Sequence, residues 1–284
     1  MTNPPVIWET RGRRIDLSVR ALTMGILNTT PDSFSDGGEF AETGPALRHA
    51  REMIAEGADI VDVGGESTRP GADPVGEEEE IARTVPVIAE LRKEWAGLIS
   101  IDTSKAAVAR EALAAGADIV NDVTGLRGDP AMVAVCAETK AGVVAMHMQG
   151  QPRTMQENPS YRDVVKEVHG FFEERLRDFV GAGLKEEAVV FDPGIGFGKG
   201  HQHNLLLLRH LDELAPAGRP LLIGLSRKSF LGRALGDMDL SLRSWPTVAL
   251  TAYTRSKGAL IHRVHEVQAN REALRMAEAI SGVS

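Results

Sequence analysis

The chain has 284 residues, a net charge of −8 and a single cysteine, and 43% of its residues are hydrophobic. The negative charge argues against a nucleic acid or an anionic membrane surface as a partner. The one cysteine, Cys136, permits no disulfide within the chain and favours a reducing, cytoplasmic location. No apolar stretch is long enough to span a membrane, and the first residues lack the apolar core of a signal peptide.

The first predicted elements are a β-hairpin before residue 20 and an apolar strand at 22–27. A polar stretch follows from Asn28 to Gly38; it is rich in turn-forming residues, and Phe34 is its one large apolar side chain. Loops of this length inside compact domains are usually functional or disordered. An amide at a strand end, followed by acids, hydroxyls and an aromatic ring, indicates a loop that covers a substrate. Composition alone is equally compatible with a surface loop that packs one Phe.

Three later segments repeat one pattern, in which a helical stretch leads to a glycine, a short β-branched strand and a polar end. They span residues 55–68, 114–125 and 256–267. Their glycines, Gly57, Gly116 and Gly258, suit the left-handed conformation that often ends a helix. A weaker fourth copy spans 140–150 and has Gly142 at this position.

Strands and helices are predicted to alternate along the chain. The strands lie at 22–27, 59–63, 98–101, 118–121, 142–146, 188–191, 220–224 and 260–263. The helices lie at 43–56, 77–94, 105–115, 129–140, 162–181, 203–213, 245–257 and 266–280. This alternation favours an α/β fold, a TIM (β/α)8 barrel, over a doubly wound sheet, which the number of elements does not exclude. We expect one domain over residues 1–284, with the N-terminal β-hairpin closing the barrel floor.

Acids and an amide follow several of the predicted strands, at the end where barrels of this type place their active sites. Asp102, Asn121 and Asp192 would therefore meet at one rim. Such groups accept hydrogen bonds from ring N–H and exocyclic NH2 groups, so the rim suits a flat, nitrogen-rich heterocycle. Each residue alone could instead be a helix N-cap, but their joint placement favours a ligand site.

Cations are predicted at the same rim: Arg69, Lys228, Arg263 and His265. Arg263 and His265 are two residues apart at a strand end, so their side chains can point to the same side. Together with Asn28 on the neighbouring first strand they indicate a diphosphate or carboxylate site. A magnesium ion held by Asn28 and by ligand phosphates would be the expected use of a metal there.

Four alternating glycines, Gly194, Gly196, Gly198 and Gly200, follow the strand that ends at Asp192. Their spacing is not that of a phosphate-binding loop, and we expect the helix to begin only after His201 to His203. We interpret the segment as a closely approaching wall of the pocket, with Phe197 as an apolar contact.

The sequence resembles the dihydropteroate synthases of the bacterial folate pathway over nearly its whole length. The motifs are NTTPDSFSDGG, DVGGESTRPGA, ISIDTSK, IVNDVTG, DPGIGFGKGHQHNLLLL, GLSRKSFLG and RVHEV, in the order and spacing of the family. The resemblance implies a TIM barrel that is usually a homodimer. It also implies a reaction of small-molecule substrates, in which 4-aminobenzoate and (7,8-dihydropterin-6-yl)methyl diphosphate give 7,8-dihydropteroate and diphosphate. Two departures, Glu266 and the segment 237–250, involve no residue expected to bind a ligand.

The resemblance further implies a role for individual residues. The pterin is expected at Asp102, Asn121, Met146, Asp192 and Lys228, and the diphosphate at Asn28, Thr68, Arg263 and His265 with Mg²⁺ on Asn28. The aminobenzoate is expected at Phe34, Thr68, Arg69, Pro70, Phe197, Ser226 and Lys228. Asp32, Asp102 and Lys228 are expected to be catalytic, in an SN1-like route in which Asp32 and Asp102 stabilise a pterin cation and Arg263, His265 and Mg²⁺ stabilise the leaving group.

Two other functions are compatible with parts of the pattern. A pterin methyltransferase domain linked to a corrinoid protein would share the pterin contacts, but it would have no need of the TTPDSFSD and STRPG loops. A non-catalytic pterin-binding paralogue should have lost loop or anion-binding residues, whereas Asp32, Arg69, Lys228 and His265 are all present.

Overall fold

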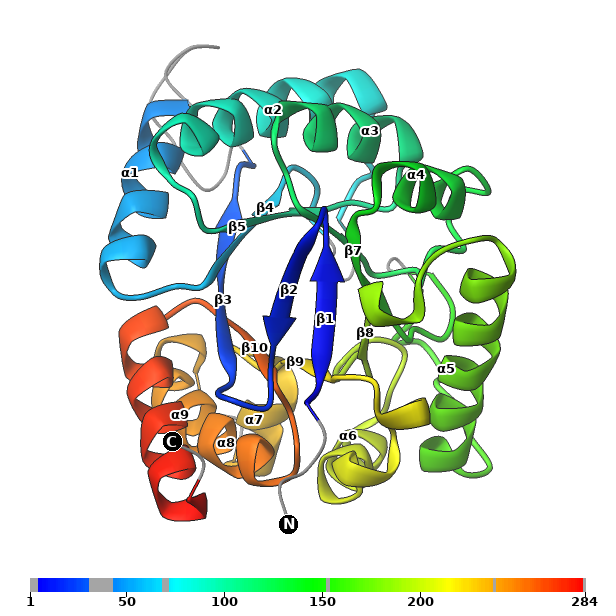
Figure 1. Cartoon of the computed structure of the whole chain (residues 1–284). Coiled ribbons are helices and arrows are strands. Elements are labelled where there is room, and N and C mark those ends of the chain that lie inside the picture. Colours follow the sequence, from blue (N-terminus) through cyan, green and yellow to red (C-terminus); the bar gives the residue numbers. More distant parts are fainter. Residues whose placement is uncertain (1–4, 31–42, 68–71, 152–153, 237–238, 283–284) are drawn as a thin grey trace.

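A computed structural model describes residues 5–30, 43–67, 72–151, 154–236 and 239–282 of the chain. Its centre is an eight-stranded parallel sheet with the order β8-β7-β6-β5-β4-β3-β10-β9. The strands are β3 (Leu22–Asn28), β4 (Ile60–Gly64), β5 (Leu98–Asp102), β6 (Ile119–Asp122), β7 (Gly142–Met146), β8 (Val189–Asp192), β9 (Leu222–Gly224) and β10 (Ile261–Val264). A parallel bridge between Phe191 and Leu221 joins the two edges of this sheet. The sheet therefore closes on itself, and the predicted (β/α)8 barrel is confirmed (Figure 1).

Helices surround the barrel on its outside (Figure 1). They are α1 (Thr43–Ala55), α2 (Glu77–Glu94), α3 (Ala106–Ala115), α4 (Met132–Thr139), α5 (Val164–Gly181), α6 (His201–Arg209), α7 (Ser229–Ala234), α8 (Ser244–Ser256) and α9 (Val267–Ser281). Short 3-10 helices are η2 (Glu186–Ala188), η3 (Leu211–Glu213), η4 (Pro216–Gly218) and η5 (Leu240–Leu242). The sequence pattern does not predict α7, because six residues are too few to display a helical repeat of apolar positions.

The part of the chain that the structure describes contains no helix both long enough and apolar enough to cross a membrane.

The interior of the barrel changes from apolar to polar along the strands. Successive residues of a strand point alternately toward the helices and toward the interior. The lowest interior positions are apolar: Leu22, Met24, Ile60, Leu98, Ile119, Val144, Val190, Leu222 and Ile261. Two residues further along, five strands carry a polar side chain: Asp62, Ser100, Asn121, Asp192 and Arg263. The barrel thus has an apolar floor and a charged mouth at the carboxyl ends of its strands.

The N-terminal hairpin, β1 (Ile7–Thr10) and β2 (Arg13–Asp16), lies across the floor of the barrel, as predicted (Figure 1). Trp8 is fully buried and packs with Leu17 against the apolar floor. Its indole Nε1–H donates to the carbonyl oxygen of Ala188 over 2.9 Å. The hairpin therefore keeps water away from the apolar end of the barrel.

Three of the four predicted helix-ending glycines are left-handed. Gly57, Gly116 and Gly258 have φ of +97°, +117° and +93°, but the prediction for Gly142 is wrong. Lys140 takes the left-handed conformation after α4 with φ +56°, and Gly142 is the first residue of β7. A Cβ atom on Gly142 would lie 2.9 Å from the Cβ of Thr10, so this glycine leaves room for the hairpin.

We expect Trp8→Ala to lower the free energy of unfolding by about 3–5 kcal/mol, because it leaves a cavity under the barrel. Trp8→Phe keeps most of the ring but leaves the carbonyl of Ala188 unpaired, and should cost about 1–3 kcal/mol. Urea unfolding measures both values. A loss below about 1 kcal/mol for Trp8→Ala would show that the hairpin does not support the barrel.

Candidate active site

Four polar side chains form one hydrogen-bonded network inside the barrel mouth. Asp62 on β4 is fully buried, and its Oδ2 accepts from Arg263 Nε at 2.6 Å and from Asn121 Nδ2 at 3.1 Å. The guanidinium of Arg263 also donates through Nη2 to Asp102 Oδ2 at 2.7 Å. One cation from β10 therefore joins carboxylates from β4 and β5, and an amide from β6 completes the network.

The burial of Asp102 and the charges around it bring its pKa close to neutral pH. Burial raises the pKa of Asp102 to about 7, while Arg263 opposes the rise and the carboxylates of Asp62, Glu80 and Asp122 add to it. Burial alone would lower the pKa of Arg263, but Asp62 and Asp102 outweigh burial and raise it. Asp102 therefore exchanges a proton near physiological pH, whereas Arg263 stays charged.

Asp102 and Asp192 differ in whether their side chains support the local backbone. Asp102 is not a helix cap, because α3 begins at Ala106 after Lys105. Asp192 does support a turn, since its Oδ1 accepts from the backbone N–H of Gly194 at 2.7 Å. Burial raises the pKa of Asp192, and the nearby Lys228 ammonium opposes that rise.

Lys228 lies between the barrel interior and the loop after β8. Its Nζ donates to the carbonyl oxygen of Ile195 at 2.5 Å and lies 4.7 Å from the centre of the Phe197 ring. Burial lowers the pKa of Lys228 to about 8, against the attraction of Asp192. A Cβ atom on Gly224 would have Lys228 Nζ at 3.8 Å and Asp192 Oδ2 at 3.9 Å. This glycine therefore lies where the two charged groups converge.

An apolar cluster adjoins these charges. Met146 at the end of β7 packs with Val123, Met148 and Met155, and Phe197 packs against the cluster. Phe197 thus has its ring between a cation and apolar side chains. This mixture of apolar surface with a few converging polar groups is typical of a ligand site.

The glycine-rich loop after β8 is held tightly against the loop after β7. A Cβ atom on Gly194 or Gly198 would collide with the backbone carbonyl of His147 or Gln149. The glycines thus allow a close approach between two neighbouring loops, and the expectation that the segment forms a wall of the pocket stays a prediction. The expected gap before the next helix is wrong, because α6 begins at His201 directly after Gly200.

Asn28 and His265 lie at the rim, on β3 and just after β10. Asn28 is half-buried, and its side chain makes no hydrogen bond within the described residues. His265 Nδ1 lies 2.8 Å from Ser226 Oγ, which also accepts from the backbone N–H of His265 at 3.2 Å. Ser226 is thus hydrogen-bonded to His265, which the sequence pattern predicts at the anion site.

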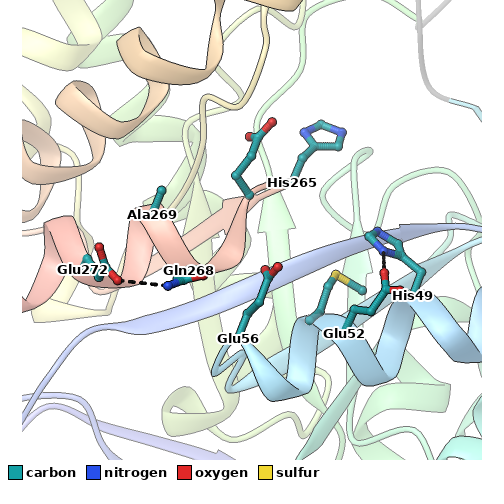
Figure 2. Close-up of a pocket in the computed structure, with 9 residues that line it drawn as sticks. His49, Glu52, Glu56, His265, Gln268, Ala269 and Glu272 are labelled. Atoms are coloured by element: carbon teal, nitrogen blue, oxygen red, sulfur yellow. Dashed lines mark hydrogen bonds and ion pairs between the residues drawn. The ribbon is translucent and has the colours of Figure 1, made fainter.

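A groove of about 310 Å³ lies beside His265 on the outside, between α1 and α9 (Figure 2). Glu52, Glu56 and Glu272 line it together with His49. These carboxylates would repel an anion, so the groove itself is unsuited to a diphosphate.

The structure brings together Asp102, Asn121, Asp192, Lys228, Arg263 and Met146 in the barrel mouth, with Phe197 adjoining and Ser226, His265 and Asn28 at the rim. The predicted site residues Asp32, Phe34, Thr68, Arg69 and Pro70 lie outside the described residues. The sequence reasoning missed Asp62. The available signal was an acid between Val61 and Val63, two positions before the strand end and therefore on the same face as Gly64.

Comparisons with known proteins identify the family. The family model described as pterin binding enzyme matches residues 24–265. A dihydropteroate synthase of Synechocystis sp. is 47% identical over 265 residues, which cover 93% of this chain and 92% of that protein. The chain belongs to the dihydropteroate synthase family. The expected enzymatic class, a transferase of folate biosynthesis, is confirmed with it.

Solved dihydropteroate synthases share the fold closely. The Xanthomonas albilineans enzyme with 4-aminobenzoic acid is 42% identical with a TM-score of 0.91, covering 99% of this chain and 100% of that one. The Burkholderia cenocepacia enzyme complexed with 7,8-dihydropteroate is 42% identical with a TM-score of 0.89, covering 99% and 98%.

Asp102 should make the free energy of unfolding depend on pH. Its pKa is about 7 in the folded protein against an ordinary value of 3.8, so between these values the folded state binds a proton that the unfolded state has lost. The resulting stabilisation is complete below about pH 4 and is lost toward pH 7, by about 1.4 kcal/mol per pH unit. We expect Asp102→Asn, which does not ionise, to remove this slope in urea unfolding between pH 4 and 8.

Burial also raises the pKa of Asp122, to about 6. Asp122 therefore gives both proteins a slope, which is smaller in Asp102→Asn because the charge of Asp102 no longer acts on it. Parallel curves for the two proteins over this range would contradict the raised pKa of Asp102.

Proposed function

We propose that the barrel mouth joins 4-aminobenzoate to the methylene of (7,8-dihydropterin-6-yl)methyl diphosphate, releasing diphosphate and 7,8-dihydropteroate. The observation that carries this assignment of roles is the buried network of Asp62, Arg263, Asp102 and Asn121 above an apolar floor. It supplies carboxylate and amide acceptors beside a fixed cation. That pattern suits a flat heterocycle with N–H donors and an anionic substituent.

The pterin is proposed to lie against Asp102, Asn121 and Asp192, with Met146 and Lys228 beside it. Within the described residues no hydrogen bond reaches Asp102 Oδ1, so this oxygen is available to a ring donor although Oδ2 binds Arg263. The raised pKa values of Asp102 and Asp192, caused by burial, support the same role. A ligand that donates to these carboxylates would offset their lost hydration.

The diphosphate is proposed to lie at Arg263, His265, Asn28 and Thr68, of which Thr68 is outside the described residues. A magnesium ion fits there only with help from the substrate. No three His, Cys, Asp or Glu side chains among the described residues lie close enough together to hold a metal alone. Asn28 offers one amide oxygen, a ligand type that Mg²⁺ accepts, and phosphate oxygens would supply others. When bound, Mg²⁺ would neutralise charge on the departing diphosphate.

The proposed chemistry is SN1-like. Arg263 and His265 stabilise negative charge as the C–O bond to diphosphate breaks, and the ionised carboxylate of Asp102 stabilises the positive charge left on the pterin methylene. Asp32 is proposed to share that role from a segment outside the described residues. The amine of 4-aminobenzoate then attacks the cation to form the C–N bond, and the proton that the nitrogen loses passes to solvent water.

The aminobenzoate is proposed to lie beside Phe197, Lys228 and Ser226, with further contacts from Phe34, Thr68, Arg69 and Pro70 outside the described residues. Phe197 offers a ring face, and Lys228 offers a cation for the carboxylate. The pKa of Lys228, lowered by burial to about 8, still leaves most of this amine charged near pH 7.

The chain is also proposed to form a cytoplasmic homodimer. Three large apolar side chains on η5 and α8 are exposed, Leu240 by 54%, Leu242 by 58% and Trp245 by 80%. Large apolar side chains that are exposed within a few residues of one another are typical of a protein–protein contact. Sedimentation velocity would measure the assembly state.

Asp102→Asn should weaken binding of 6-hydroxymethyl-7,8-dihydropterin at least about tenfold, because it replaces an acceptor oxygen with a donor. Calorimetry at pH 8, where the wild-type carboxyl is ionised, measures the change. The matched control is Asp59→Asn, since Asp59 pairs with Arg20 at the opposite end of the barrel. Unchanged affinity in folded Asp102→Asn would show that the ring binds elsewhere.

Arg263→Lys and His265→Ala should each weaken binding of the pterin diphosphate about tenfold more than binding of the bare hydroxymethyl pterin, which Arg263 affects only indirectly, by holding Asp62 and Asp102. Lys keeps the charge of Arg263 but not its planar set of donors. Titration calorimetry with both ligands gives the ratio. Equal losses for the two ligands would assign these residues to the pterin ring instead of the diphosphate.

A further inference from the structure

Asp62 is buried below the residues assigned to the pterin, and no role in the reaction has been given to it. Its side chain is fully buried on β4, facing the barrel interior. Only Oδ2 is used within the described residues, by Asn121 Nδ2 and Arg263 Nε, whereas Oδ1 has no hydrogen-bond partner there. A buried ion of this kind is costly and calls for a functional explanation.

The carboxylate restricts how Asn121 can present its amide. An ionised carboxylate only accepts hydrogen bonds, so Asn121 must turn its NH2 group toward Asp62. The reverse orientation would place the amide oxygen against a carboxylate oxygen. The oxygen of Asn121 and its second N–H then remain for a ligand.

The same oxygen also fixes Arg263. Asp62 accepts from Nε and Asp102 accepts from Nη2, so the guanidinium plane is held at two edges. Without Asp62, the guanidinium would keep one carboxylate partner and could rotate about it.

We propose that Asp62 is a positioning residue, which sets the donor and acceptor pattern that Asn121 and Arg263 present to the substrate without touching the substrate itself. The proposal rests on the pterin role given to Asn121 above. This role depends on the acceptor oxygen of residue 62 and not on its charge. Substitutions that change one of these two properties at a time can therefore test it.

Asp62→Asn keeps an acceptor oxygen for both neighbours, and its new NH2 group would take the place of Oδ1. That group would have a possible acceptor in Ser100 Oγ, since Ser100 is the register partner of Asp62 on β5 and its hydroxyl is unpaired within the described residues. Asp62→Thr keeps one shorter acceptor. Asp62→Val has nearly the shape of Thr but offers no acceptor.

The experiment measures binding of 6-hydroxymethyl-7,8-dihydropterin by calorimetry for these variants of the full chain. We expect a loss below about threefold for Asp62→Asn, an intermediate loss for Asp62→Thr and at least about tenfold for Asp62→Val. Asp62→Val combined with Asn121→Ala should lose little more than the larger single loss, because the two residues act as one unit. The control Asp59→Asn, which removes a carboxylate at the far end of the barrel, should bind normally.

The outcomes are distinct. Additive losses for Asp62→Val and Asn121→Ala, or a loss for Asp62→Asn as large as that for Asp62→Thr, would overturn the positioning role while leaving the pterin role of Asn121 intact. Normal binding by Asn121→Ala would overturn both. If Asp62→Val does not fold, the comparison of Asp62→Asn with Asp62→Thr still decides between an acceptor and a purely ionic role.

Discussion

The double ion pair of Arg263 with Asp62 and Asp102 is the interaction on which the mouth of the barrel depends. Three carboxylates, those of Asp62, Asp102 and Asp192, lie in the interior close to one another. Removing an ion from water costs several kcal/mol, and a buried ion left without its partner destabilises a protein by about 3–5 kcal/mol. The guanidinium suits this position because it stays charged and donates along two directions at once. A single fixed cation thus allows two acids to share a space from which water is largely removed.

The ion pairs do not fully offset the cost of burying these charged groups, and the part of the cost that is left favours the binding of a ligand. Burial still raises the pKa of Asp102 to about 7 and lowers that of Lys228 to about 8, so both groups lie near the point of losing their charge. Such groups gain most from a ligand that restores hydrogen bonds to the charged form. A pterin that donates to the acids and carries a diphosphate toward the cations would supply these bonds. The protein's own arrangement of dipoles and charges would then be ready before the C–O bond breaks.

Much of the fold follows from local sequence, whereas the site follows only in part. The strands are visible because they are continuous apolar runs, and the prediction placed each within about two residues of its position. The repeat predicts a helix-ending role for Gly142, but this glycine begins β7, where the lack of a side chain leaves room for Thr10, a residue far away in the sequence. Acids that end an apolar strand, such as Asp102 and Asp192, can be recognised from the sequence, because the change from apolar to polar residues marks them. Asp62 does not, because its meaning appears only when β10 and β6 bring Arg263 and Asn121 to it.

The polar layer also specifies the register of the barrel. Side chains alternate between the interior and the helices, so a shift of one residue in β4 would turn Val61 and Val63 into the mouth and Asp62 toward the apolar helix faces. Asp62 would then be a buried charge without Arg263, while Val63 would face Asp102 and Asn121. Each of these changes is unfavourable because it leaves a buried charged or polar group without its partner. In the observed register the double ion pair offsets that desolvation cost. The charges that suit the mouth to a ligand therefore also disfavour the register shifted by one residue. The apolar floor, which packs on Trp8, disfavours the same shift at the other end of the barrel.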